Sequence, residues 1–160
     1  DGGGDYLCSV AYAVDSDGIV YITDVTFTDE PMEVSEVLVS DMLRRNDTRE
    51  VLVESNNGGR GFARAIERQL PRVRVEWFHQ SNNKEARILS NSATVIHSLR
   101  MPHDWNIRWN ELYTHLTTYR RLYSANRWHD AADVLTGIVE QQSGSHVRKV
   151  RFFGNQTPHL

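Results

Sequence analysis

Two segments rich in β-branched and aromatic residues, joined by a short polar turn, constrain the fold of this chain most strongly. Residues 6–14 and 19–27 each predict a β-strand, and the Asp-Ser-Asp-Gly stretch that ends at Gly18 predicts a tight turn. Residues 6–27 therefore predict a β-hairpin. Helical and extended patterns alternate after it, which favours an α/β layered sheet with helices on its faces.

Hydrophobic periodicity predicts the remaining elements. They are expected in this order: a helix over 28–46, a strand over 51–53, a helix that ends at Leu70, a strand over 73–78, and helices over 84–97, 105–122 and 130–142. The first helix is expected to bury the apolar residues Val34, Val37, Leu38 and Met42. Without a linker that could split it, the chain is expected to form one domain over 1–142, followed by a basic tail over 143–160.

Composition excludes several classes of protein. Among 160 residues, 39% are hydrophobic and 24% are charged, which is typical of a globular domain rather than a disordered chain. Apolar runs all fall short of the roughly 18 residues of a membrane span. The single cysteine, Cys8, cannot form an internal disulfide, and the start at Asp1 lacks the pattern of a signal peptide. We therefore expect a reducing, cytosolic compartment.

The net charge of −3 hides an asymmetry along the chain. Residues 1–50 carry three basic and twelve acidic residues, whereas residues 51–160 carry fifteen basic and nine acidic residues. Such a division fits a nucleic-acid surface beside an acidic metal site, and it equally fits two solvated faces. Negative net charge does not exclude a bound polyanion, because the local field governs binding.

Acidic residues recur at three predicted element ends that lie far apart in the sequence. Asp1 and Asp5 flank a glycine-rich turn, Glu54 ends an apolar strand, and Asp130 and Asp133 begin a helix. Carboxylates that converge from different elements can bind Mg²⁺ or Mn²⁺, and two such ions support phosphodiester hydrolysis. The alternatives are solvated acids and, for the last pair, helix capping.

A glycine-rich loop and an arginine stripe follow Glu54. The segment Glu54-Ser-Asn-Asn-Gly-Gly places glycines between a strand end and a helix start, where another backbone can come close. Arg60, Arg64 and Arg68 then share one helix face, which suits the backbone of a nucleic acid and also a plain solvated surface. The loop lacks the Gly-Lys-Ser/Thr of a phosphate-binding NTPase loop.

Lys84 and Arg87 begin a further predicted helix, one turn apart. A lysine there can reach a phosphate or help to orient an attacking water. Ordinary solvation of a helix start explains the same pattern, and spacing alone does not choose between the two interpretations.

Four motifs in a fixed order carry a resemblance to a known family. They are Asp5-Tyr6 after the glycine-rich turn, Glu54-Ser-Asn-Asn-Gly-Gly, Asn83-Lys84-Glu-Ala-Arg87-Ile88, and His129-Asp-Ala-Ala-Asp133-Val-Leu. Over residues 1–142, the chain resembles the C-terminal nuclease domain of the large terminase subunit of tailed bacteriophages. The resemblance implies an RNase H-like (RuvC-like) mixed sheet with flanking helices. It also implies a metal-dependent endonuclease that cuts concatemeric viral DNA.

The resemblance assigns roles to individual residues. Glu54 matches the middle metal-binding acid of the family and Asp130 matches the late acid. His129 stands where the family has the first of two adjacent acids. The first metal-binding Asp of the family ends a strand upstream of the glycine-rich turn, so Asp1 or Asp5 would have to replace it, or that strand lies upstream of Asp1.

The resemblance thus implies a complete set of site residues and partners. The expected catalytic residues are Asp5, Glu54, Asp130 and Lys84. The expected ligands of two Mg²⁺ or Mn²⁺ ions are Asp1, Asp5, Glu54, Asp130 and Asp133. The expected DNA contacts are Arg60, Arg64, Arg68, Lys84 and Arg87. The implied partners are double-stranded DNA, the terminase ATPase domain, the small terminase subunit and the portal, without a membrane, in the cytoplasm of the host bacterium. A resolvase or transposase of the same fold, and a non-catalytic DNA- or portal-docking module, are the alternatives.

Overall fold

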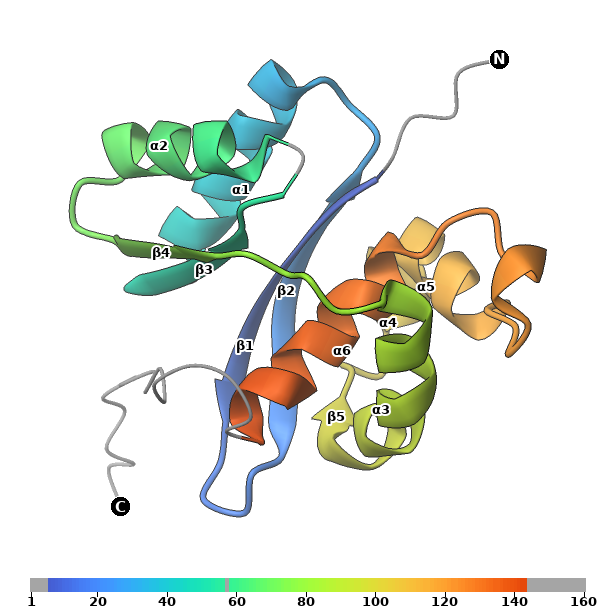
Figure 1. Cartoon of the computed structure of the whole chain (residues 1–160). Coiled ribbons are helices and arrows are strands. Elements are labelled where there is room, and N and C mark those ends of the chain that lie inside the picture. Colours follow the sequence, from blue (N-terminus) through green and yellow to red (C-terminus); the bar gives the residue numbers. More distant parts are fainter. Residues whose placement is uncertain (1–5, 57, 144–160) are drawn as a thin grey trace, which may run out of the picture.

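A hairpin of two long strands forms the centre of the structure. The computed structural model describes residues 6–56 and 58–143. Strands β1 (Leu7–Val14) and β2 (Val20–Thr28) pair antiparallel, which confirms the predicted hairpin. Figure 1 shows this hairpin running through the middle of the molecule, with helices on both sides.

The turn of the hairpin is fixed by the side chain of Asp15. Its Oδ1 accepts hydrogen bonds from the backbone N–H of Asp17, at 3.0 Å, and of Ile19, at 2.9 Å. These bonds lower the pKa of Asp15, that from Ile19 most. Gly18 completes the turn with a φ of +82°, a conformation that favours glycine. The predicted turn chemistry is therefore confirmed.

The strands form two separate sheets rather than one. A short strand that the sequence did not predict, β5 (Leu99–Arg100), joins the hairpin in parallel to β2, and the first sheet has the order β1-β2-β5. The second sheet holds β3 (Glu50–Glu54) and β4 (Arg74–Phe78), which pair in parallel. The described residues show no ladder between β1 and β3.

Helices cover both sides of the hairpin. Their bounds are α1 (Met32–Arg45), α2 (Gly59–Gln69), α3 (Lys84–Ser98), α4 (Trp105–Arg108), α5 (Asn110–Thr117) and α6 (Asp130–Gln142), with a 3-10 turn at Tyr123–Ala125. Helix α2 lies against β3 and β4, and α1 lies against α2 and the hairpin, whereas α3 to α6 gather on the other side of the hairpin (Figure 1). Within the described part of the chain, every helix is too short or too polar to span a membrane.

Two of the expected helices differ from the prediction. The helix expected over 105–122 is broken at Trp109, whose φ of −132° and ψ of 58° are not helical, and α5 already ends at Thr117. Helix α1 buries a face adjacent to the predicted one: Val34, Val37 and Leu38 are exposed. The buried face includes Ser35 and Ser40, whose small side chains let α1 approach its neighbours closely. Only Met42 of the predicted set is buried.

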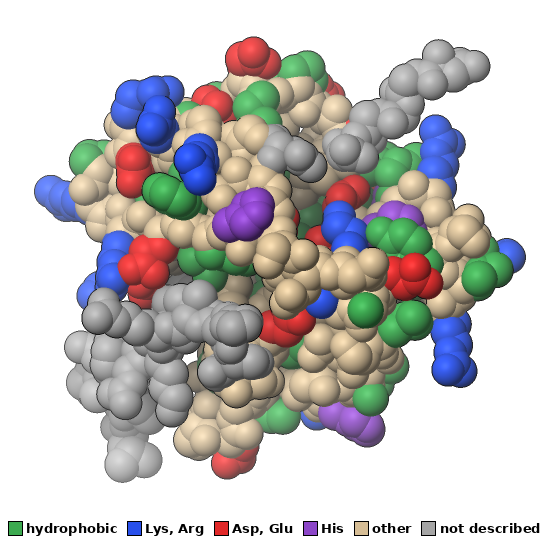
Figure 2. All heavy atoms as spheres, in the orientation of Figure 1, with side chains coloured by type: hydrophobic (Ala, Val, Ile, Leu, Met, Phe, Trp, Pro, Cys, Tyr) green, Lys and Arg blue, Asp and Glu red, His purple; other side chains and the backbone are tan. Residues whose placement is uncertain are grey.

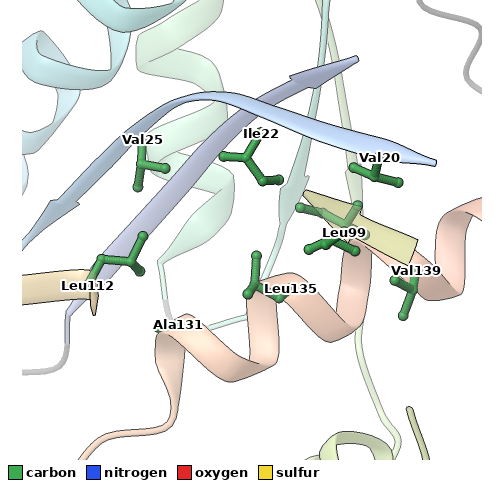
Figure 3. Close-up of a cluster of buried hydrophobic side chains, with 9 residues drawn as sticks. Val20, Ile22, Val25, Leu99, Leu112, Ala131, Leu135 and Val139 are labelled. Carbon is green, nitrogen blue, oxygen red and sulfur yellow. The ribbon is translucent and has the colours of Figure 1, made fainter. Parts of the chain in front are cut away.

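The described residues form two hydrophobic clusters. One lies between the hairpin and α6 and includes Val20, Ile22, Leu99, Leu135 and Val139, drawn in Figure 3. The other lies under α1 and α2; its buried members are Val39, Met42, Leu43, Phe62, Ile66 and Leu70. Residues of β1 pack against both clusters, so this strand connects the two halves of the core.

Replacing Leu135 with alanine should lower the free energy of unfolding by about 2–5 kcal/mol, because it leaves a cavity between α6 and β2. The side chain of Leu135 is 4% exposed. Urea denaturation of the variant beside Ile107→Ala checks this. Ile107 is 79% exposed, so the control should change stability by no more than about 0.5 kcal/mol. Equal effects of the two substitutions would contradict the assignment of this core.

Candidate functional site

Glu54 stands at the carboxyl end of β3 and its side chain is exposed. The apolar strand before it is half-buried, because β3 is covered on only part of its surface. The Asn56 amide donates a hydrogen bond of 2.8 Å to Glu54 Oε1 and another of 2.8 Å to the Gln80 carbonyl. Asn56 therefore orients the Glu54 carboxylate at the end of the second sheet.

Two glycines make the sharp turn from β3 into α2 possible. Gly58 has a φ of +92°, and a Cβ on Gly59 would overlap the carbonyl oxygen of Glu54. The backbone of α2 thus begins directly against the end of β3. This confirms the expectation that the glycines let two backbone segments come close, and it couples the position of Glu54 to the start of α2.

Asp130 is the first residue of α6 and lies beside the start of β1. Its Oδ2 accepts a hydrogen bond of 3.3 Å from the backbone N–H of Tyr6, and its Oδ1 lies 3.7 Å from Lys84 Nζ. His129 occupies the N-cap position without a capping hydrogen bond from its side chain. The Asp130 carboxylate is therefore turned toward β1 and Lys84 and does not serve as a helix cap.

Asp133 lies one turn further along α6 and is almost fully buried. Its Oδ2 lies 3.2 Å from Lys84 Nζ and its Oδ1 lies 2.8 Å from Arg87 Nη1. Partial burial disfavours the charged form of Lys84, but Asp133 and Asp130 outweigh it and raise the pKa of the ammonium group. Lys84 therefore stays protonated between the two carboxylates.

Arg87 is 7% exposed and bridges α3 to α6. Besides Asp133, its guanidinium contacts Glu140 with distances of 2.7 Å from Nη2 and 3.0 Å from Nε. Burial opposes its charge, while the hydrogen bond to Glu140 and the charge of Asp133 raise the pKa of Arg87. Arg87 therefore links α3 to α6, and this arrangement does not support the predicted contact with DNA.

One groove gathers five of the predicted site residues. Glu54, Lys84, Arg87, Asp130 and Asp133 all line it, although they come from β3, α3 and α6. The charge of Glu54 also contributes to the raised pKa of Arg87, so the second sheet and α3 interact here. Sequence separation gave no reason to expect Lys84 beside Asp130, and the structure brings them together.

The carboxylates in the described part of the chain are not arranged as a metal-binding group. Among residues 6–56 and 58–143, no group of three His, Cys, Asp or Glu side chains is placed to hold a metal ion. Asp133 is already engaged by two cations, which leaves Glu54 and Asp130 as the available oxygen donors. The two other expected ligands, Asp1 and Asp5, lie outside the described residues.

The arginine stripe of α2 lies apart from this groove. Arg60, Arg64 and Arg68 are all exposed, and Figure 2 shows Lys and Arg side chains gathered over α2 at the upper left of the molecule. The Arg60 guanidinium also lies 4.8 Å from the centre of the Trp77 ring. The stripe is a free cationic surface next to the Glu54 end of β3, as the helical spacing predicts.

Two residues that line the groove, Arg127 and Trp128, were not predicted, and the Arg127 guanidinium lies 4.2 Å from the centre of the Trp128 ring. They belong to the segment before α6, where the only sequence signal is a concentration of aromatic and basic residues. His129, which the resemblance places at the position of a family acid, also lines the groove. Its ring stacks on Tyr123 at 3.7 Å, and Tyr119 Oη lies 2.9 Å from its Nδ1.

Cys8 also lines the groove. Burial, with a contribution from the charge of Asp130, raises the pKa of its thiol. Its side chain packs against the cluster between the hairpin and α6, as a small core residue does.

The combination of hairpin, alternating helices and strands, and acidic residues at element ends facing one groove defines an RNase H-like α/β domain. A family model for the ribonuclease H-like domain of bacteriophage T7 terminase matches residues 1–101. The chain belongs to this family of terminase RNase H-like domains. No curated protein matches the sequence.

Replacing Gly59 with alanine should destabilise the protein by about 1–3 kcal/mol, because the new Cβ overlaps the Glu54 carbonyl and displaces the end of β3. Gly61 provides the matched control, since a Cβ there meets nothing within 4 Å. Gly61→Ala should be neutral or stabilise by about 0.4–1 kcal/mol. Thermal melts of both variants check this, and an unchanged melt for Gly59→Ala would refute the close approach.

Replacing Arg87 with methionine should destabilise the protein by about 3–5 kcal/mol at neutral pH, because Asp133 and Glu140 lose a buried partner. Denaturant titrations at neutral pH check this, with the exposed Arg64→Met as control. A cost at neutral pH no greater than that of the control would contradict the bridging role.

Proposed function

We propose that this chain is the nuclease domain of a phage terminase large subunit and that it hydrolyses phosphodiester bonds in concatemeric double-stranded DNA. Family membership supports a nuclease-type role in DNA packaging. The observation that carries the finer proposal is the convergence of Glu54, Asp130 and Lys84 on one groove from three separate elements. These residues lie far apart in the sequence, and packing of the fold alone does not require them to share one surface.

Glu54 and Asp130 are the proposed ligands of divalent metal ions. Carboxylate oxygens are the donors that Mg²⁺ and Mn²⁺ prefer, so the chemistry of these side chains fits. When bound, two such ions would supply an activated water and charge stabilisation for the leaving oxygen. Further donors are required, and Asp1 or Asp5 remain candidates for that place.

Lys84 is proposed to act on the substrate phosphate. Its Nζ donates toward Asp130 and Asp133, and its side chain is 40% exposed, so one donor stays available to the groove. A cation there offsets the charge that accumulates on a phosphate during in-line attack. Asp133 holds the ammonium in place, which makes Asp133 a positioning residue in this proposal.

The arginine stripe is proposed to contact the DNA backbone. Arg60, Arg64 and Arg68 are exposed on one face of α2, and α2 begins at the loop that follows Glu54. Phosphates bound along α2 would bring the duplex toward the groove. The ATPase domain, small subunit and portal, in the cytoplasm of the host, are the proposed partners.

A non-catalytic docking module is the second candidate. It is favoured by the lack, within the described ranges, of a group of three acidic or histidine side chains placed for a metal. Such a module would bind DNA or portal through the same basic surface and leave the DNA intact. A resolvase or transposase of the same fold would instead require branched or end-specific DNA.

Cleavage of supercoiled plasmid in Mn²⁺, Mg²⁺ or EDTA tests the proposal. Nicking should need the metal. Glu54→Gln and Asp130→Asn should each reduce the nicking rate by at least about 100-fold, because the loss of even a residue that only supports a metal ligand costs up to about 100-fold in activity. The control is Glu33→Gln, because Glu33 is an exposed acid on α1 that lies outside both the groove residues and the arginine stripe. Its activity should match the parent protein.

Two outcomes would contradict the proposal in different ways. Cleavage that persists in both variants would show that the assigned carboxylates are not the site. DNA binding that is weakened by Arg64→Ala, without cleavage in any metal, would support the docking module.

A further inference from the structure

The segment between α5 and α6 carries positive charge that the proposed site does not use. Residues 118–129, which we call the basic loop, contain Arg120, Arg121 and Arg127 and no acidic residue. All three arginine side chains are exposed, and none of them has an ion pair or a side-chain hydrogen bond within the described ranges. Exposed cations without a protein partner are available to an anionic ligand.

The side chain of Asn126 holds the basic loop in one shape. Its Oδ1 accepts a hydrogen bond of 2.7 Å from the backbone N–H of Arg120, and its Nδ2 donates one of 2.8 Å to the Arg120 carbonyl. The same Nδ2 also donates to the carbonyl oxygens of Leu122, at 3.1 Å, and Tyr123, at 3.2 Å. Because the two ends of residues 120–126 are joined, less conformational entropy is lost when a ligand binds the loop.

Aromatic packing orients Arg127. Its guanidinium lies 4.2 Å from the centre of the Trp128 ring, and this ring stacks on His115 at 4.7 Å. Tyr6 packs edge-on against Trp128 and stacks on Phe27. Stacking uses the flat face of a guanidinium, so the N–H groups in its plane stay free to bind phosphate oxygens in pairs.

The basic loop adjoins the proposed site. Tyr123 of the loop stacks on His129 at 3.7 Å. Burial raises the pKa of Tyr123, while the charge of Lys84 opposes this rise and the charge of Asp130 adds to it. Arg127 lines the groove itself. A ligand bound by the basic loop therefore lies at the wall of the groove that carries Asp130.

The basic loop and the arginine stripe lie on different sides of the molecule. Helix α2 begins after Glu54, whereas the basic loop leads into α6 at Asp130. Figure 1 shows α2 and the segment before α6 on opposite sides of the hairpin, and Figure 2 shows Lys and Arg side chains at both of these edges. A small anion would contact only one of the two surfaces. Double-stranded DNA carries one charge per roughly 1.7 Å of its axis, so a single duplex offers phosphates to both.

We propose that the basic loop is a second DNA-binding element, in which Arg120, Arg121 and Arg127 bind the phosphate backbone of the duplex on the Asp130 side of the groove. The arginine stripe of α2 binds the same duplex on the Glu54 side. The inference rests on the proposed function in so far as duplex DNA is the substrate of the groove. Contacts to phosphates carry no sequence information, so this grip is independent of the DNA sequence.

Binding of a fluorescent DNA duplex in EDTA, measured by anisotropy at several salt concentrations, tests the proposal without cleavage. For each phosphate contact that is lost, the slope of log Kobs against log salt concentration decreases in magnitude by about 0.9. The loop variant carries Arg120→Gln, Arg121→Gln and Arg127→Gln. Its slope should be smaller than that of the parent protein by about 2–3.

A control variant separates the loop from a general effect of net charge. It carries the same change at three exposed arginines that lie outside the groove, the arginine stripe and the basic loop: Arg44→Gln, Arg72→Gln and Arg100→Gln. The control variant and the loop variant have equal net charge. The slope of the control variant should match that of the parent protein, and thermal melts should show that both variants are folded.

A further variant tests the fixed shape of the loop. Asn126→Ala keeps every arginine but removes the four hydrogen bonds that close residues 120–126. The dissociation constant for DNA should rise by about 3–10-fold, because binding must then order the loop. The salt slope should stay at the parent value, since no phosphate contact is lost.

Two results would overturn the proposal. One is a loop variant whose salt slope equals that of the control variant, which would leave the three arginines to an acidic protein partner instead. The other is an Asn126→Ala protein that binds DNA as tightly as the parent. A reduced slope of the loop variant in a protein that cleaves no DNA in any metal would reject the nuclease function alone, whereas plasmid cleavage with an unchanged slope would reject the loop contact alone.

Discussion

The buried guanidinium of Arg87 determines how the acidic helix α6 sits against α3. It is held by Asp133 and Glu140, which lie on one face of α6 two turns apart, so rotation of α6 would break both contacts at once. Buried ion pairs contribute little net stability, but they penalise any arrangement that leaves one charge without its partner. This penalty fixes the start of α6, and with it the distance between Lys84 and Asp130. The positions of Lys84 and Asp130 therefore depend on Arg87, whose guanidinium is already engaged by Asp133 and Glu140.

The other half of the site depends on the glycine turn instead. Glu54 belongs to the second sheet, and its position follows from the close contact between Gly59 and the end of β3. The only strand whose residues pack against both hydrophobic clusters is β1, as far as the described residues show. Glu54 thus belongs to the half of the core under α1 and α2, and Asp130 belongs to the half beside α6. The two halves share strand β1 but no continuous sheet.

Local patterns in the sequence predicted those parts of the fold that local chemistry decides. The hairpin, α2, α3 and α6 were correctly located, because turn residues and a clear apolar period mark them. The buried face of α1 was not, since apolar residues lie on two adjacent faces of this helix and their spacing alone does not choose between them. The break at Trp109 and the two-residue β5 likewise depend on neighbours distant in sequence. For the site, spacing placed Glu54 and Asp130 at element ends, but it could not reveal that Arg87 points inward to carboxylates 46 and 53 residues away.

The separation of the strands into two sheets affects the choice between the two candidate functions, a nuclease and a docking module. A docking module needs a stable surface, and the exposed stripe of α2 provides one whether or not the two sheets are joined. A nuclease needs carboxylates held at a fixed separation, because metal ions tolerate little displacement of their ligands. The isolated pair of Glu54 and Asp130 lacks that constraint, since β1 and β3 share no hydrogen bonds across the groove among the described residues.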